Sequence, residues 1–203
     1  MLEETRPDSG IIDLMKTSGA LLSGHFELAS GLHSDKYIQC ALLLEDPVRA
    51  EQVGKDLAAE LEEKLAGRRP DVVVSPAVGG LIIGHEVARA LGARSIFAER
   101  LSGKMTLRRG FNIEKGERAV VVEDVFTTGG SIKEVIEVVR ERGGEVLAVG
   151  SIVNRGVNVD FGVPTAYLVR GQIKNHEPAS CPLCKKGIDV VKPGSKRLQM
   201  GAR

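Results

Sequence analysis

The chain has 203 residues, of which 42% are hydrophobic and 27% charged, and its 28 basic and 27 acidic side chains leave a formal net charge of +1. This length fits one domain with a sizeable core and is too short for two domains joined by a linker. The charge balance argues against nucleic acid or a membrane surface as the main partner. No stretch approaches the run of ~18 apolar residues that a membrane-spanning helix needs.

The compartment is predicted from the cysteines and the first residues. The three cysteines, at positions 40, 181 and 184, are odd in number, and residues 1–8 are acidic and lack the apolar region of a secretory signal. These features argue against a disulfide framework and predict a protein that stays in the cytoplasm.

The first half of the chain is predicted to contain a short helix, a strand and a longer helix, followed by a buried strand. We expect a short helix over 11–17, a strand over 25–28 and a turn-rich stretch to residue 35. A longer helix begins at Asp46-Pro47, an N-cap followed by a proline at the first helical position, and ends at Gly67. The apolar run 71–77 is typical of a strand buried on both faces of a parallel sheet.

The second half continues the alternation. Helices are expected over 81–91 and 131–142, and strands over 95–98, 119–122 and 146–153. The polar stretch 101–117 is long for a connection and predicts a functional or mobile loop, or a flexible hairpin. Strands alternating with helices predict a doubly wound α/β sheet. The proline- and glycine-containing residues after 170 are expected to form an irregular extension packed on the core.

The segment from Val120 to Ser131 carries the clearest chemical pattern. Ligands of an open parallel sheet bind beyond the carboxyl ends of the strands, where Glu123 and Asp124 are expected, and adjacent carboxylates suit vicinal hydroxyls or a metal-bound substrate. The run Thr127-Thr-Gly-Gly-Ser131 then begins a helix, whose unpaired N–H groups and positive dipole end fit a phosphate. Taken alone, the segment is also compatible with a solvated strand end and an ordinary capping turn.

The same segment lacks the end of a Walker A loop and the glycine pattern of dinucleotide-binding folds. It resembles instead the diphosphate-sugar motif of the type I phosphoribosyltransferases. Within that superfamily the chain from about residue 9 to 195 is similar to the orotate phosphoribosyltransferases. The order of four further motifs supports this resemblance: Ser30-Gly-x-His-Ser-x-Lys-Tyr37, Ser75-Pro-Ala-Val-Gly-Gly80, Glu99-Arg-Leu-Ser-Gly-Lys104 and Val153-Asn-Arg155.

The resemblance implies a fold and a reaction. The fold is the type I phosphoribosyltransferase fold, a doubly wound and mostly parallel sheet flanked by helices, with a small N-terminal hood. We therefore expect a single domain with a hood over about 1–45, an α/β core over 46–170 and the extension over 171–203. The implied reaction joins orotate to 5-phosphoribosyl 1-diphosphate, giving orotidine 5'-phosphate and pyrophosphate in UMP biosynthesis. Mg²⁺ would be held mainly through the substrate, with no direct side-chain ligand.

The resemblance also implies roles for individual residues. Arg100, Lys104 and Asp124 are the implied catalytic residues, since negative charge grows on the departing pyrophosphate. In the family the basic loop closes over the active site of the neighbouring subunit, which implies a homodimer. Orotate is expected to contact Tyr37, Thr127 and Arg155, the arginine binding its carboxylate. The diphosphate sugar is expected to contact Arg100, Lys104, Glu123, Asp124, Val125, Phe126, Thr127, Thr128, Gly129, Gly130 and Ser131.

Several positions depart from the family's pattern and leave open which basic residues dominate catalysis. The departures are Ala29 and Gly79 in place of lysines, Leu101 in place of a second lysine after the arginine, Thr106 in place of a histidine and Ile38 in place of an aromatic residue. Two alternatives remain. One is a regulator that senses the diphosphate sugar and binds nucleic acid. The other is a purine phosphoribosyltransferase, which would have no carboxylate for Arg155 to bind.

Cys181 and Cys184 have the spacing of zinc ligands, and His176 lies five residues upstream of Cys181. A single Cys-x-x-Cys pair is half of a zinc site, and the four histidines show no metal-binding spacing. We therefore favour reduced thiols in an irregular tail over a structural zinc, which would be shared across a dimer.

Overall fold

The computed structural model describes residues 2–6, 10–28, 30–156 and 158–193. Within this part of the chain, one sheet has seven strands. Their spatial order is β1 (Glu3–Glu4), β9 (Thr165–Arg170), β8 (Glu145–Asn154), β7 (Arg118–Phe126), β4 (Val72–Pro76), β5 (Arg94–Leu101) and β6 (Lys104–Leu107). The five central strands run parallel, and the two edge strands are antiparallel to their neighbours. The predicted α/β sheet is confirmed.

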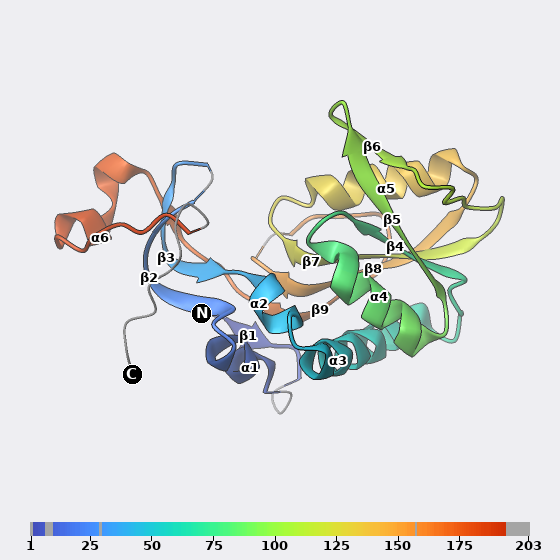
Figure 1. Cartoon of the computed structure of the whole chain (residues 1–203), viewed down its shortest axis with the longest axis horizontal. Coiled ribbons are helices and arrows are strands. Elements are labelled where there is room, and N and C mark those ends of the chain that lie inside the picture. The colour runs from blue at the N-terminus through green and yellow to red at the C-terminus, as the bar shows by residue number, and fades with distance from the viewer. Residues whose placement is uncertain (1, 7–9, 29, 157, 194–203) are drawn as a thin grey trace.

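Helices cover both faces of this sheet (Figure 1). The helices α3 (Pro47–Leu65) and α4 (Gly80–Leu91) pack on one face together with α1 (Ile11–Thr17) and α2 (Cys40–Leu44), while α5 (Gly130–Glu141) packs on the other. Neighbouring strand residues face opposite clusters: Val120 contributes to the α3 side and Val121 to the α5 side. Both are fully buried, as expected for strands covered on two faces.

The helix predicted from Asp46-Pro47 is confirmed as α3. The Asp46 side chain accepts hydrogen bonds from the N–H groups of Val48 and Arg49, which the first turn of a helix otherwise leaves unpaired. Leu57 and Leu61 are fully buried against the sheet. A Cβ at Gly54 would lie only 2.4 Å from the Cβ of Glu86, so glycine lets α3 and α4 approach closely.

The long connection 101–117 begins as a hairpin, one of the forms that its length predicted. Strands β5 and β6 pair through Leu101 and Lys104, and the two turn residues Ser102 and Gly103 have φ values of 51° and 84°. Such a two-residue turn matches the twist of the strands that it joins. The pairing also extends β5 past the predicted residues 95–98.

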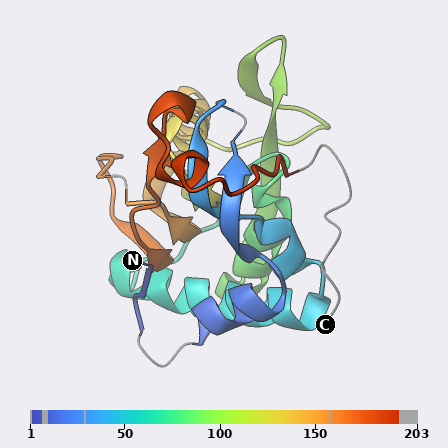
Figure 2. The ribbon, with the colours of Figure 1, turned by 90° about the vertical axis from the view of Figure 1, so that its left-hand side faces the viewer.

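A second sheet stands beside the core and consists of β2 (Leu21–Glu27), β3 (His33–Ile38) and β10 (Asn175–His176) (Figures 1 and 2). We call this sheet, with residues 175–193, the hood. The expected strand 25–28 is the end of the longer β2, and β3 begins inside the stretch expected to be only turns.

The placement of the C-terminal segment was predicted wrongly. It contains β10, the short helix η1 (Pro178–Ser180) and α6 (Pro182–Lys185), and it lies on the hood, not on the core. Val191 exchanges backbone hydrogen bonds with His25 and Glu27, which fixes the segment along β2. No helix among the described residues is long and apolar enough to cross a membrane.

Candidate active site

A cavity of about 270 Å³ lies between the hood and the carboxyl ends of β7 and β8. Its position is the one expected for a ligand of an open parallel sheet. Tyr37, Thr127 and Arg155, which were predicted to bind one substrate, all line it, although 118 positions separate the first from the last. The full lining is Leu28, Lys36, Tyr37, Ile38, Asp124, Val125, Thr127 and Arg155.

A larger hollow, of about 540 Å³, lies at the other end of the sheet. It is formed by the C-terminal ends of α3 and α4 and by residues 67–70, which precede β4. Parallel sheets bind ligands at the carboxyl ends of their strands, and this hollow lies at the amino end. We therefore assign the active site to the smaller cavity.

Glu123 and Asp124 lie within the last residues of β7, which runs to Phe126 and does not end at Val122 as predicted. Burial, followed by the neighbouring charge of Asp124, raises the pKa of Glu123 to about 7. Burial also raises the pKa of Asp124, although a hydrogen bond of 2.9 Å from the N–H of Val125 opposes that rise. The two carboxyls are thus poorly solvated acceptors that would gain from hydroxyl groups or a cation.

The loop after β4 lies directly against this acidic pair. A Cβ built on Gly79 would stand 2.7 Å from Oδ1 of Asp124, so a side chain at position 79 would displace the carboxylate. This contact gives a local reason for glycine where the family's pattern has lysine. The other substituted lysine position, Ala29, lies outside the described residues.

The turn between β7 and α5 has the geometry predicted for a phosphate site. Gly129 is the N-cap of α5 with a φ of 75° and has no side chain to cap the helix, although the N–H of Gly130 donates to Oγ1 of Thr128 at 3.4 Å. Thr127, Thr128 and Gly130 are exposed, so the start of the helix, whose N–H groups lack intrahelical acceptors, is open to solvent. A Cβ on Gly129 would meet the Phe161 ring at 2.9 Å, so both the dihedral angle and the space require glycine.

Phe126 is an exception among the predicted contacts of the diphosphate sugar. Its side chain is 2% exposed and packs against Phe161, with ring centroids 5.4 Å apart. Only its backbone is therefore placed to meet a ligand, while the ring supports the turn from below.

Arg155 and Lys36 are the cationic side chains of the cavity. Burial lowers the pKa of the Arg155 guanidinium, which donates a hydrogen bond of 3.3 Å to the amide oxygen of Asn175 in β10. No carboxylate forms an ion pair with Arg155 among the described residues. A half-buried guanidinium without an anion is a favourable site for a carboxylate ligand.

The basic hairpin does not reach this cavity within one chain. Arg100 donates to Glu134 of α5 at 2.8 Å and to the carbonyl of Gly103 at 2.9 Å, and Lys104 is exposed near the tip. In Figure 1 the hairpin rises from the top of the core, whereas the hood stands at the left. The structure thus brings the residues predicted to contact orotate together with Asp124 but leaves Arg100 and Lys104 apart from them.

A second group of chemically active side chains was missed from the sequence. His25, His33, Cys181 and Cys184 place one potential ligand atom each within 4.8 Å of one another. The sequence spacing of the histidines, which showed no metal-binding pattern, did not indicate this group. His176, the histidine nearest to the cysteines in sequence, does not belong to the group. Sequence spacing could not reveal a group whose halves lie about 150 residues apart.

Comparison with known proteins identifies relatives over most of the chain. Residues 44–183 match the family model of the phosphoribosyl transferase domain. An orotate phosphoribosyltransferase of Caldanaerobacter subterraneus is 52% identical over 189 residues, which cover 93% of this chain and 97% of the relative. One of Thermotoga petrophila is 52% identical over 192 residues, covering 93% and 100%. The solved orotate phosphoribosyltransferase of Aeropyrum pernix has a TM-score of 0.62 at 32% identity, covering 78% of this chain and 93% of that one.

Proposed function

This chain belongs to the phosphoribosyltransferase family, with the orotate phosphoribosyltransferases as its close relatives, and on that premise we propose the reaction at its cavity. It transfers the ribose 5-phosphate group of 5-phosphoribosyl 1-diphosphate to orotate, giving orotidine 5'-phosphate and pyrophosphate for UMP synthesis. The observation that carries the choice of base is Arg155, a guanidinium without a carboxylate partner beside Tyr37 and Thr127. A purine has no carboxylate for this group to bind.

The diphosphate sugar occupies the edge formed by β7 and α5. Its 5-phosphate accepts hydrogen bonds from residues 127–131 at the start of α5, where the helix dipole favours an anion. Glu123 and Asp124 accept hydrogen bonds from the ribose hydroxyls and offset the positive charge that develops on the sugar ring. Orotate then lies between the sugar and the hood, with Tyr37 and Ile38 covering its ring.

Magnesium fits the donor atoms of this edge. The half-buried carboxylates of Glu123 and Asp124 are hard oxygen donors, which suit Mg²⁺, and no cysteine or histidine lines the cavity. Mg²⁺ bound to the diphosphate would neutralise charge on the leaving group. We propose that the substrate supplies the direct ligands and that these two carboxylates lie near the ion.

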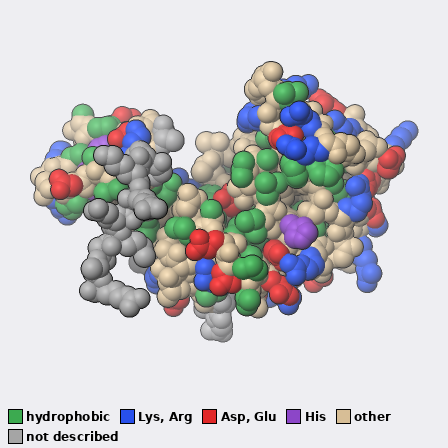
Figure 3. Space-filling model, in the orientation of Figure 1, with side chains coloured by type: hydrophobic (Ala, Val, Ile, Leu, Met, Phe, Trp, Pro, Cys, Tyr) green, Lys and Arg blue, Asp and Glu red, His purple; other side chains and the backbone are tan. Residues whose placement is uncertain are grey.

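Arg100 and Lys104 would act on a neighbouring subunit, since the hairpin does not reach the cavity of its own chain. Val78, Leu101 and Ile82 are hydrophobic side chains that are 80%, 50% and 44% exposed. Figure 3 shows hydrophobic side chains gathered on the core below the hairpin. Burial of such residues favours a homodimer. The proposed enzyme is cytoplasmic and forms one domain, with the core and the hood, which includes the C-terminal extension, as its parts. The absence of a disulfide among its three cysteines suits that compartment.

The reaction is tested by incubating the purified protein with 5-phosphoribosyl 1-diphosphate, Mg²⁺ and orotate and following the loss of orotate absorbance. Hypoxanthine, adenine and uracil serve as control bases. Arg155→Gln should lower kcat/KM for orotate by about 100-fold or more, because the carboxylate loses a charge-assisted pair. Turnover of a purine in place of orotate would overturn the proposal.

The shared site is tested by mixing two inactive variants. Lys104→Ala keeps its own acidic pair, and Asp124→Asn keeps its own hairpin, so a mixed dimer contains one complete site if the hairpin acts across the interface. Random reassociation of equal amounts should restore about a quarter of the wild-type activity. Failure to recover any activity would assign the hairpin to its own subunit. Orotate binding to Lys104→Ala should stay near the wild-type value while its rate falls.

A further inference from the structure

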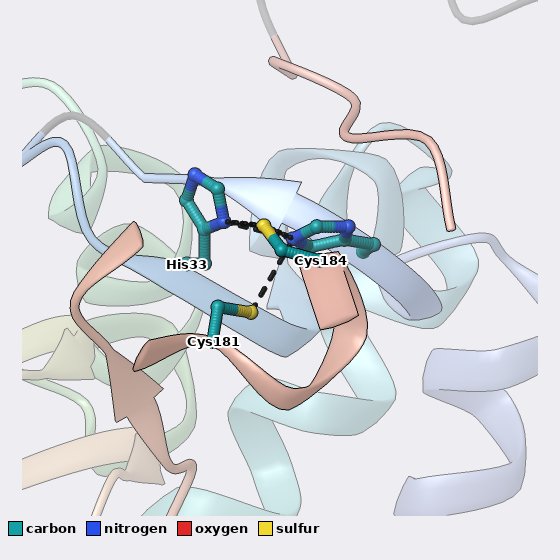
Figure 4. Close-up of side chains that lie close together, drawn as sticks. His33, Cys181 and Cys184 are labelled. Atoms are coloured by element: carbon teal, nitrogen blue, oxygen red, sulfur yellow. Dashed lines mark hydrogen bonds between the residues drawn. The ribbon is translucent and has the colours of Figure 1, made fainter. Parts of the chain in front are cut away.

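A compact group of nitrogen and sulfur ligands lies in the hood, apart from the substrate cavity. His25 comes from β2, His33 from β3, and Cys181 and Cys184 from the turn of α6. Figure 4 shows His33, Cys181 and Cys184 pointing toward one another from the sheet and the C-terminal segment. His25, His33 and Cys181 are buried, and the thiols are not joined in a disulfide.

Three of the distances between the ligand atoms are close to those in a four-coordinate metal site. Zn–S bonds of about 2.3 Å and Zn–N bonds of about 2.0 Å place tetrahedral ligand atoms about 3.3–3.8 Å apart. Sγ of Cys184 lies 3.3 Å from Nδ1 of His33 and 3.7 Å from Nε2 of His25, and Sγ of Cys181 lies 3.6 Å from the latter. The two ring nitrogens are 2.8 Å apart, so a small outward shift of one ring completes the tetrahedron.

The hydrogen bonds around the group orient one of the rings as a ligand. Nδ1 of His25 lies 2.7 Å from the backbone carbonyl of Ile188, which can only accept, so this nitrogen carries the proton. In the neutral ring, Nε2 then carries the lone pair, and this atom lies near Nδ1 of His33 and the sulfurs of both cysteines. Metal-bound histidines are held by this kind of bond to a carbonyl, which fixes both the tautomer and the ring.

We propose that His25, His33, Cys181 and Cys184 bind one Zn²⁺ per chain as a closed structural site. Two thiolates and two neutral imidazoles balance the charge of the ion, and mixed sulfur and nitrogen ligands select zinc over the oxygen-preferring Mg²⁺. Four protein ligands leave no open position for a substrate, so the ion holds structure and does no chemistry. All four ligands come from one chain, in contrast to a zinc shared across a dimer.

The ion would fasten the C-terminal segment to the strands that line the cavity. Among the described residues, the other links between the two include the pairing of β10 with β3 at two positions, the backbone hydrogen bonds of Val191 to β2, and an ion pair between Lys192 and Glu27 at 2.6 Å. Tyr37 and Lys36 lie on the same strand as His33, and Asn175 of β10 contacts Arg155. Metal binding therefore supports the orotate side of the cavity from behind. The zinc proposal itself rests on the ligand geometry and is independent of the proposed reaction.

The site is tested on the reduced, full-length protein by metal analysis and by titration with Co²⁺ after removal of the metal. We expect one zinc per chain, and for Co²⁺ the intense visible bands and thiolate charge-transfer band of a tetrahedral site. Cys184→Ser removes one ligand from an exposed position and should weaken metal binding at least about 100-fold, more than the loss of an outer-shell partner does. His176→Gln is the matched control, because His176 pairs with His33 in the sheet but lies outside the group.

Two further readouts separate a ligand role from a general structural one. Cys184→His keeps four ligands, so it should retain stoichiometric zinc while the cobalt charge-transfer band weakens. Removal of zinc from the wild type should expose residues 175–193 to proteolysis and leave the core resistant. A reduced wild-type protein that binds neither Zn²⁺ nor Co²⁺ at one per chain would overturn the proposal. Equal metal affinity in Cys184→Ser and the wild type would do so as well.

Discussion

The core and the hood are held together by different interactions. The core sheet is covered on both faces by buried aliphatic side chains, among them Val72, Val73, Val120 and Val121, each fully buried. The hood has three strands and a C-terminal segment whose Ile188, Val190 and Val191 remain 42–46% exposed. Its innermost side chains include His25, His33, Ser34 and Cys181. The core therefore gains its stability from the hydrophobic effect, and the hood needs another source.

The core and the hood also supply different side chains to the proposed active site. In the proposed site, the core supplies the acidic pair, Glu123 and Asp124, and the phosphate turn, which comprises residues 127–131. The strand β7 and the helix α5 fix the positions of these residues. The hood supplies Tyr37 and Lys36 from a small sheet that could not stay folded on its own apolar surface. A structural metal lets such a small sheet hold these side chains without a large core. The proposed zinc site thus explains why the polar hood is ordered.

The largest effect is expected from a cavity in the core. Leu61→Ala removes a fully buried side chain that also contacts the position of Gly150, and it should lower the free energy of unfolding by about 2–5 kcal/mol. Ile188→Ala in the hood should change it by less than about 0.5 kcal/mol, because that side chain is 46% exposed. Urea unfolding measures both. Equal losses would show that the hood is as dependent on apolar burial as the core.

The next largest effect is expected at the phosphate turn. Gly129→Ala places a Cβ 2.9 Å from the Phe161 ring at a φ of 75°, so the turn must shift, with a loss of about 2–3 kcal/mol. Affinity for the diphosphate sugar, measured by calorimetry, should fall by at least about tenfold. The metal content of the hood should stay unchanged. A loss of metal content together with the loss of affinity would mean that the core and the hood fold as one unit.

The sequence predicted the core better than the hood for a physical reason. Strands buried on both faces and an amphipathic helix capped by Asp46 leave unbroken patterns of apolar residues, so β4, α3 and α5 were predicted to within a few residues. In the hood, β3 reads His-Ser-Asp-Lys-Tyr-Ile, and its inward residues are polar. A pattern based on apolar periodicity identifies such a segment as a turn.

The two candidate sites also differ in how well the sequence predicted them. The acidic pair and the phosphate turn are contiguous in sequence, so spacing alone indicated their chemistry, and Tyr37 and Arg155 came from the resemblance to a family. The four proposed hood ligands come from segments about 150 residues apart, and the pairing of β10 with β3 and the bonds of Val191 to β2 help to bring them together. The Cys-x-x-Cys spacing of Cys181 and Cys184 was a signal in the sequence, but nothing in it connected these cysteines with His25 and His33. It becomes specific only once the fold is known.

A smaller effect, and one of opposite sign, is expected from Glu123 at the core side of the cavity. Its pKa of about 7 in the folded protein exceeds its ordinary value of 4.5, so the folded state binds more protons between these pH values. Stability due to this group therefore falls as the pH rises from about 4.5 to about 7. Glu123→Gln should remove that loss and gain about 1–2 kcal/mol at about pH 8 relative to wild type.

Urea unfolding at several pH values measures this gain, and Glu137→Gln on the exposed face of α5 is the control. A higher free energy of unfolding for Glu123→Gln would show that the core is less stable than it could be at the edge where the substrate is proposed to bind. A pH-independent difference for Glu123→Gln would contradict the assignment of a poorly solvated carboxyl.

The smallest effect on stability is expected where the basic hairpin meets the core. Arg100 and Glu134 form an ion pair between half-exposed side chains, so Glu134→Gln should lower the free energy of unfolding by less than about 1 kcal/mol. The same change releases Arg100 from its contact with α5. A hairpin that closes over the cavity of a neighbouring subunit must break this contact. The rate at low ionic strength should then rise by up to about fivefold. The dependence of the rate on salt concentration should weaken, because in the wild type salt screens this ion pair, which the variant lacks. Steady-state kinetics at two ionic strengths measures both. A lower rate would instead mean that Glu134 holds Arg100 where catalysis needs it, and the hairpin would then belong with the rigid core, not with the parts of the site that move.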